Sequence, residues 1–261
     1  MPKNDVVMTY IGGPTALIAW NGLRLLTDPT FDPAGSEYPT SAYTLRKTSD
    51  PALGAAEIGA IDVVLLSHDH HFDNLDHAGR EILAKASIVI TTEAGASRLG
   101  NNAIGLSAWE HREIRSPAGD VLRVTATPAR HGPAGGDRGP VIGFALTRGV
   151  GVGAGAVYVS GDTVWYDGVR EVSERFDVRV ALLFCGKARV SAAGDNDLTM
   201  SADDAVKAAQ VLARATIVPL HYEGWEHFTQ SRADLERAFA KAGVSQRVAW
   251  PAAGEPTDIS L

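Results

Sequence analysis

Apolar, β-rich runs that stop at a histidine or an aspartate are the feature that most constrains how this chain of 261 residues can fold. Four such runs lie far apart in the sequence and end at His68 with His70, His131, Asp162 and His221. Strand ends are rigid, and the loops that leave them can gather side chains from distant parts of a chain into one cleft. Imidazole and carboxylate groups are the donors that divalent metals take from proteins. The pattern therefore predicts one metal site assembled from separate strands.

The order of the elements predicts two sheets with helices outside them, in a single domain over residues 1–261. The pair Asn21-Gly22 lies between two alternating runs and predicts a hairpin. The first helix is expected to have Asp73 or Asn74 as its N-cap, and the third to have Ser201. Helices are expected over 74–86, 93–99, 201–214 and 231–243, and strands over 6–11, 15–20, 23–28, 61–68, 87–92, 120–131, 141–149, 156–163, 179–186 and 215–221.

Charge and composition narrow the classes of partner. A formal net charge of −7 argues against a nucleic-acid partner, because phosphate binding relies on a basic surface. The single cysteine, Cys185, excludes an internal disulfide and fits a reducing compartment. No apolar run is long enough to span a membrane, and the N-terminus lacks the apolar core of a signal peptide. We therefore expect a cytoplasmic protein that acts on a small molecule, and a homo-oligomer is compatible with the sequence.

The segment "SHDHHFDNLD" over residues 67–76 follows one of these strands directly, and its His-x-His can grip one ion at a strand end. With "TDPTF", "RHGP", "VSGDT" and "VPLHYEGWEHF", the chain resembles the metallo-β-lactamase superfamily. The signature of that superfamily is His-x-His-x-Asp-His followed by a distant His, an Asp and a last His. More narrowly it resembles the bacterial metal-dependent hydrolases that include ascorbate-6-phosphate lactonase.

This resemblance implies an α/β fold, a four-layer αββα sandwich with a dinuclear metal site at one edge between the sheets. It implies two divalent ions, with zinc expected first and manganese as the alternative. Residue by residue, it implies His68, His70 and His131 as ligands of the first ion, Asp162 as the bridging carboxylate, and His221 and Asp73 as ligands of the second.

One residue too many separates His70 from Asp73, and here the chain departs from the signature. Counted forward from His68, the acidic position falls on Phe72, which cannot bind a metal, so the loop must bulge. Asn74 then occupies the position that usually holds a histidine. Three readings stay open: Asn74 is a helix cap or supports the ligands, His71 turns inward as the missing imidazole, or Asn74 itself binds the metal. An amide oxygen would make the second site richer in oxygen and more suited to manganese.

The expected reaction is hydrolysis by a hydroxide that bridges the two ions, with Asp73 and Asp162 as the catalytic carboxylates. A small ester, lactone or phosphodiester, with an anionic substrate as one option, is the expected substrate class. The alternatives are a phospholipase-like phosphodiesterase, or a non-catalytic metal-binding or regulatory domain of the same fold.

Several further side chains have a functional reading beside a structural one. Tyr222 and His227 are candidate substrate contacts, and packing or a structural hydrogen bond is the alternative for each. Trp165 follows the bridging Asp162 and is expected either to line the substrate mouth or to pack in the core. Lys187 and Arg189 could meet an anionic substrate, although solvated loop charge is the default expectation.

Overall fold

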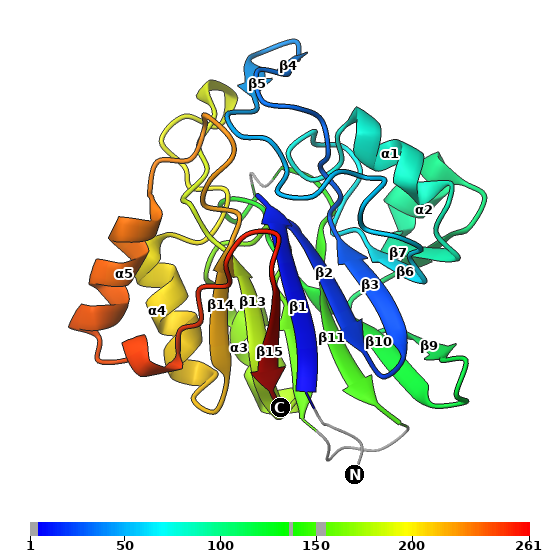
Figure 1. The fold of residues 1–261 in the computed structure, drawn as a ribbon. Helices are drawn as coiled ribbons and strands as arrows, with labels where there is room; N and C mark the ends of the chain where they lie inside the picture. Colours follow the sequence, from blue (N-terminus) through cyan, green and yellow to red (C-terminus); the bar gives the residue numbers. More distant parts are fainter. Residues whose placement is uncertain (1–4, 136–137, 150–154) are drawn as a thin grey trace.

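The computed structural model describes residues 5–135, 138–149 and 155–261 and has the expected four-layer arrangement of two sheets between two layers of helices (Figure 1). One sheet has seven strands in the order β15-β1-β2-β3-β6-β7-β8, and the other has six in the order β14-β13-β12-β11-β10-β9. The first sheet consists of β1 (Asp5–Gly12), β2 (Thr15–Trp20), β3 (Leu23–Thr27), β6 (Val63–Leu65), β7 (Ile88–Thr92), β8 (Ala103–Leu106) and β15 (Pro256–Ser260). The second consists of β9 (His111–Arg115), β10 (Val121–Pro128), β11 (Ile142–Arg148), β12 (Ala156–Val159), β13 (Val178–Phe184) and β14 (Thr216–Leu220).

The helices cover the outer faces of the two sheets (Figure 1). Beside the first sheet lie α1 (His77–Leu83) and α2 (Glu93–Leu99), and beside the second lie α3 (Asp167–Arg175), α4 (Ala202–Val211) and α5 (Arg232–Lys241). A separate two-stranded hairpin of β4 (Glu37–Pro39) and β5 (Thr44–Arg46) projects at one end of the molecule. In the described part of the chain, no helix is long and apolar enough to cross a membrane.

Alternation along the strands builds the core between the sheets. In β1, Val6, Met8 and Tyr10 point inward, and Leu122 and Val124 of β10 belong to the same buried cluster. The opposite faces of the sheets form two further clusters, one against α1 and the other against α3, α4 and α5. Each sheet is therefore buried on both faces, and this holds its strand ends in fixed positions.

Most of the predicted elements are present, and the Asn21-Gly22 hairpin is confirmed with positive φ angles of 56° and 74°. The predicted start of the first helix is wrong. Its N-cap is Asp76, whose carboxylate accepts from the backbone N–H of Gly79, and α1 begins at His77. Asp73 lies too early in the chain to cap α1, and its carboxylate instead lies 3.0 Å from His227 Nε2. The sequence did not predict β4, β5, β8, β9, α3 and β15.

Candidate metal centre

The strand ends that were predicted to carry metal ligands lie close together in the structure. Asp162, from the loop after β12, contacts two of the strand-end histidines. Its Oδ2 lies 3.6 Å from His131 Nε2 and its Oδ1 lies 2.9 Å from His221 Nδ1. Ligand atoms of His68, His131 and Asp162 all lie within 4.8 Å of one another, and all three side chains are buried. Four distant segments of the chain thus supply one cluster of potential metal ligands.

His71 stands at the middle of this cluster. Its Nδ1 lies 2.9 Å from His68 Nε2 and 3.1 Å from His131 Nε2. The bulge has therefore turned His71 inward, to a position from which it can bind a metal together with two of the predicted ligands.

The other ring nitrogens of His68 and His131 are already committed. His68 Nδ1 lies 2.9 Å from Ser67 Oγ, which is itself 2.8 Å from Asp28 Oδ1. Asp28 Oδ1 also accepts from the backbone N–H of Ser67, so it is an acceptor whether or not the carboxyl is ionised. Ser67 therefore donates to Asp28 and accepts from His68. His131 Nδ1 donates to the carbonyl oxygen of Leu198 over 2.8 Å. Both histidines thus present an unprotonated Nε2 to the cluster.

This donor set fits a cation. Burial and the neighbouring histidines hold the pKa of His68 well below its usual value, and burial lowers the pKa of His131 and brings that of His71 to about 3. Three neutral rings therefore meet, and the single proton of His71 can satisfy only one of the two facing lone pairs. Among the described residues, the buried Oδ2 of Asp162 has no hydrogen-bond partner. If the His71 proton moves to Nε2, three nitrogen lone pairs and one carboxylate oxygen face one another, which is a donor set typical of zinc.

A second group of donors adjoins the first. Asp73 Oδ2 lies 3.0 Å from His227 Nε2 and 3.7 Å from His221 Nε2. Within the described ranges, His221 Nε2 is buried without a hydrogen-bond partner. Burial raises the pKa of Asp73, but the hydrogen bond from His227 and the nearby imidazoles outweigh it and hold the pKa well below its usual value. Since Asp162 contacts His131 and His221, it lies between the two groups, where a bridging ligand would lie.

Two further candidate ligands of this segment, His70 and Asn74, lie in different surroundings from His68, His71 and His131. His70 is partly exposed, and its Nε2 donates to the backbone oxygen of Arg138 over 2.9 Å, although one of its nitrogens lies within 4.8 Å of those of His68 and His71. Asn74 is fully buried, and neither atom of its amide has a hydrogen-bond partner in the described part of the protein. Binding of a metal by His70 or Asn74 stays a prediction.

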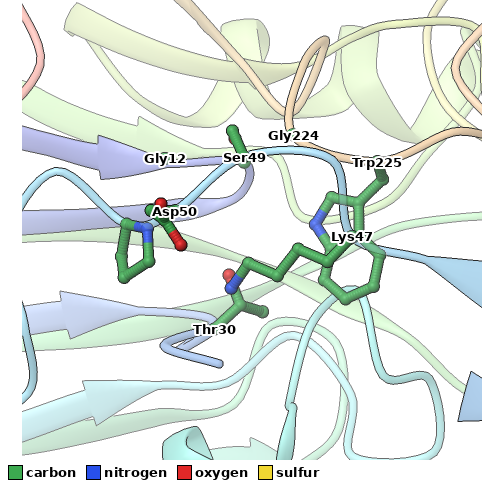
Figure 2. Close-up of a pocket in the computed structure, with 9 residues that line it drawn as sticks. Gly12, Thr30, Lys47, Ser49, Asp50, Gly224 and Trp225 are labelled. Atoms are coloured by element: carbon green, nitrogen blue, oxygen red, sulfur yellow. The ribbon is translucent and has the colours of Figure 1, made fainter. Parts of the chain in front are cut away.

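The other carboxylates of the segment 67–76 serve the fold. Asp69 accepts from Arg98 Nε over 2.8 Å, and Asp76, the cap of α1, forms a buried ion pair with Lys47 Nζ at 3.1 Å. Lys47 also lies 5.5 Å from the ring centre of Trp225. Both side chains line a small cavity, in which Figure 2 shows Lys47 between Trp225 and Thr30. The ion pair of Lys47 with Asp76 links the end of the hairpin to the segment 67–76.

The backbone is under local strain at this end of the sheets. Asp28 and His221 have φ angles of 23° and 56°, a region that side-chain-bearing residues rarely adopt. Gly161, one residue before Asp162, has a φ of 59°, and a Cβ there would lie 2.5 Å from the carbonyl oxygen of Ile142. Strained backbone at two positions around one cluster, beside a glycine that only the absence of a Cβ permits, is typical of a functional site.

A small cavity opens onto the cluster. Its lining consists of Tyr43, Leu45, His71, Asp73, His131, Arg138, Ala188, Val190, Leu198 and His227. His227, a predicted substrate contact, therefore reaches the cavity. Tyr222 packs edge-on against Trp250 at 5.7 Å in the core beneath α5, and Trp165 lies 6.0 Å from the guanidinium of Arg170, so neither is among the lining residues.

Two polar lining residues, Tyr43 and Arg138, were not predicted from the sequence. Tyr43 and Arg138 lie in loops without a recognisable motif, and only the tertiary structure brings them to the cavity. Lys187 and Arg189, the cations considered from sequence, instead both pair with Asp197, at 3.9 Å and 2.7 Å.

Comparisons with known proteins agree with this geometry. The profile of the beta-lactamase superfamily domain matches residues 23–222. A metal-dependent hydrolase of the UPF0173 family from Methanoregula boonei is 32% identical over 227 residues, covering 84% of this chain and 83% of its own. A relative of the same name from Salinibacter ruber is 29% identical over 248 residues, covering 92% and 95%.

Solved structures show the same fold. The isothiocyanate hydrolase from Delia radicum gut bacteria superposes with a TM-score of 0.81 at 24% identity, covering 98% of this chain and all of its own. A possible metal-dependent hydrolase from Veillonella parvula gives 0.79 at 20% identity, covering 96% and 98%. None of these four relatives is named a lactonase, so the narrower resemblance stays a prediction. This chain belongs to the beta-lactamase superfamily and, within it, to the UPF0173 metal-dependent hydrolases.

Proposed function

We propose that this metal-dependent hydrolase binds two divalent ions, zinc or manganese, and cleaves a small ester, lactone or phosphodiester. The observation that carries the proposal is the meeting of His68, His71 and His131 with the unpaired carboxylate oxygen of Asp162 beside a small cavity. When bound, the ions supply the Lewis acidity that activates water and polarises a carbonyl or phosphoryl oxygen.

The residues around the cluster have separable tasks. His68, His71, His131 and Asp162 would hold one ion, and Asp162, Asp73 and His221 would hold the other. Because Asp73 lines the cavity, its carboxylate can also orient the attacking water. His227 Nε2 carries the proton that it shares with Asp73 Oδ2, which puts a proton donor on the cavity wall.

Elemental analysis of protein purified without chelators tests the metal count. We expect two equivalents per chain and hydrolysis of at least one member of a panel of lactones, esters and phosphodiesters. An isothiocyanate belongs in the panel because a protein of the same fold is an isothiocyanate hydrolase. Metal-free protein that stays inactive after zinc or manganese is added would instead support a non-catalytic domain.

Asp162→Ala should lower the metal content by at least one equivalent and remove nearly all hydrolysis. Asp177→Asn is the control for loss of a carboxylate, because Asp177 pairs with Arg179 and Arg214 outside the cluster. Its metal content should equal that of the wild type. Normal turnover by the Asp162 variant would refute the bridging role.

A further inference from the structure

We propose that Arg138 and Tyr43 form an anion-binding mouth over the metal centre, which selects substrates that carry a carboxylate or phosphate apart from the scissile bond. The inference rests on the proposed function, because it names the substrate class of the same site. It starts from the position of Arg138, a residue that no sequence motif marks.

The backbone of Arg138 is tied to the metal-site segments on both sides. Its N–H donates to the carbonyl oxygen of His131 over 2.8 Å, and its own carbonyl oxygen accepts from His70 Nε2 over 2.9 Å. The backbone of Arg138 is therefore held in a fixed position relative to His131 and His70. An arginine held in this way can present its guanidinium at a constant distance from a substrate bound at the ions.

The side chain of Arg138 is oriented by Tyr43. Arg138 Nη2 donates to Tyr43 Oη over 3.0 Å, and the guanidinium carbon lies 5.7 Å from the centre of the tyrosine ring. Because the phenol oxygen accepts this bond, its own hydrogen remains available to an anion. A guanidinium has five N–H donors in a planar fork that matches carboxylate and phosphate oxygens. Within the described ranges, no carboxylate lies within 4.0 Å of Arg138, so its charge is not neutralised by an ion pair there.

Three other cations near the site are already paired. Lys187 and Arg189 share Asp197, and Lys47 is buried against Asp76. Among the described residues that line the cavity, Arg138 is the one arginine or lysine, and it can meet an anion there.

The size and walls of the cavity restrict the rest of the substrate. The cavity is narrow, and Leu45, Val190 and Leu198 give it apolar walls. The geometry fits a short apolar linker between the scissile group at the cluster and an anionic group at Arg138. A half-ester of a short dicarboxylic acid, or a compact lactone that carries a phosphate, has this form.

A matched pair of chromogenic esters tests the selection. Mono-4-nitrophenyl succinate carries a carboxylate tail, and 4-nitrophenyl butyrate is its neutral counterpart of the same chain length. We expect metal-loaded wild-type protein to favour the anionic ester in kcat/KM. Arg138→Gln should lower the ratio of anionic to neutral kcat/KM by about 10- to 100-fold, the usual effect of one hydrogen-bonded charge. Arg138→Lys should give an intermediate ratio, because lysine keeps the charge without the fork.

Arg46→Gln is the control for a general change in charge. Arg46 is exposed in β5 of the same hairpin as Tyr43 and pairs with Glu37 and Glu226. The ratio of anionic to neutral kcat/KM of Arg46→Gln should match that of the wild type. Equal metal content in all variants excludes damage to the cluster. A ratio that is unchanged in Arg138→Gln overturns the proposal.

Calorimetric titration with succinate and with glycerol 3-phosphate gives an answer even if neither ester is cleaved. Weaker binding to Arg138→Gln than to the wild type supports the mouth, and the stronger of the two ligands shows whether carboxylate or phosphate is preferred. Equal binding to both proteins, or no binding to the wild type, overturns it. Failure of the proposed function would appear separately, as missing metal or as no hydrolysis of any member of the wider panel.

Discussion

Ser67→Ala should weaken metal binding without removing a ligand. In the wild type, Ser67 Oγ lies 2.8 Å from Asp28 Oδ1 and 2.9 Å from His68 Nδ1, and it holds the histidine proton on Nδ1. Without the hydroxyl, that proton loses its acceptor in a fully buried position. It can then move to Nε2, which faces His71 Nδ1 at 2.9 Å. A metal ion would have to displace it from there.

The size of the expected loss in metal affinity follows from these two hydrogen bonds of Ser67. Partners that orient a ligating histidine contribute about 10- to 100-fold in metal affinity, which corresponds to roughly 1.4 to 2.8 kcal/mol. The metal-free protein should also lose about 1 to 3 kcal/mol of unfolding free energy, because buried polar groups are left unpaired. The effect on affinity should therefore be comparable to the effect on stability.

Competition with a chromophoric zinc chelator measures the affinity, and urea unfolding of the metal-free protein measures the stability. Thr92→Ala is the matched control, because it removes the side-chain cap of α2 at a similar cost of about 1 kcal/mol and lies outside the cluster. We expect the control to lose stability and keep its affinity for zinc. An affinity of Ser67→Ala within twofold of the wild type would refute the tautomer argument.

Three further predictions concern the same region. Lys47→Met should cost about 3 to 5 kcal/mol in urea unfolding, because it leaves the buried carboxylate of Asp76 without its cation; a loss below about 1 kcal/mol would contradict this. His71→Ala should lower the metal content of the purified protein by one equivalent, whereas His70→Ala should lower it less, and elemental analysis of both variants decides between them. The metal-free protein should lose stability as the pH falls from about 6.5 to about 3, because the unfolded chain protonates His71 near 6.5 and the folded protein only near 3; an unfolding free energy that does not fall over this window would contradict the burial of a neutral ring.

The sequence predicts the strand ends well because they depend on local pattern. Runs such as 120–131 show both the β-strand and the histidine that follows it, and the structure brings His131 and Asp162 together as expected. The cap of α1 could not be predicted in the same way. Asp73, Asn74 and Asp76 are all acceptable caps by residue type, and only the pairing of Asp73 with His227 and of Asp76 with Lys47 distinguishes them. These partners lie far away along the chain.

The meeting of Arg138 and Tyr43 could not be predicted from the sequence for the same physical reason. Arg138 follows a Gly/Pro-rich loop and has no spacing relation to the metal-site residues in the sequence. Its position depends on backbone hydrogen bonds with His131 and His70, and its orientation depends on Tyr43, about a hundred residues earlier. Conversely, Lys187 and Arg189 looked suitable by charge alone, but Asp197 in the same loop pairs with both.

The segment 67–76 contacts both the cluster of potential metal ligands and the hairpin of β4 and β5. Phe72 stacks on Tyr38 of β4 with ring centres 4.7 Å apart, and it packs with the small apolar cluster that includes Leu45 and Tyr43. With Phe72 held against the hairpin, His71 on one side of it reaches His68 and Asp73 on the other reaches His221. Without the inserted residue, the segment would have one residue fewer with which to bring His71 to His68 and Asp73 to His221. The bulge therefore supplies an additional imidazole to the cluster and, through the same turn of backbone, anchors the hairpin that carries Tyr43 over the cavity.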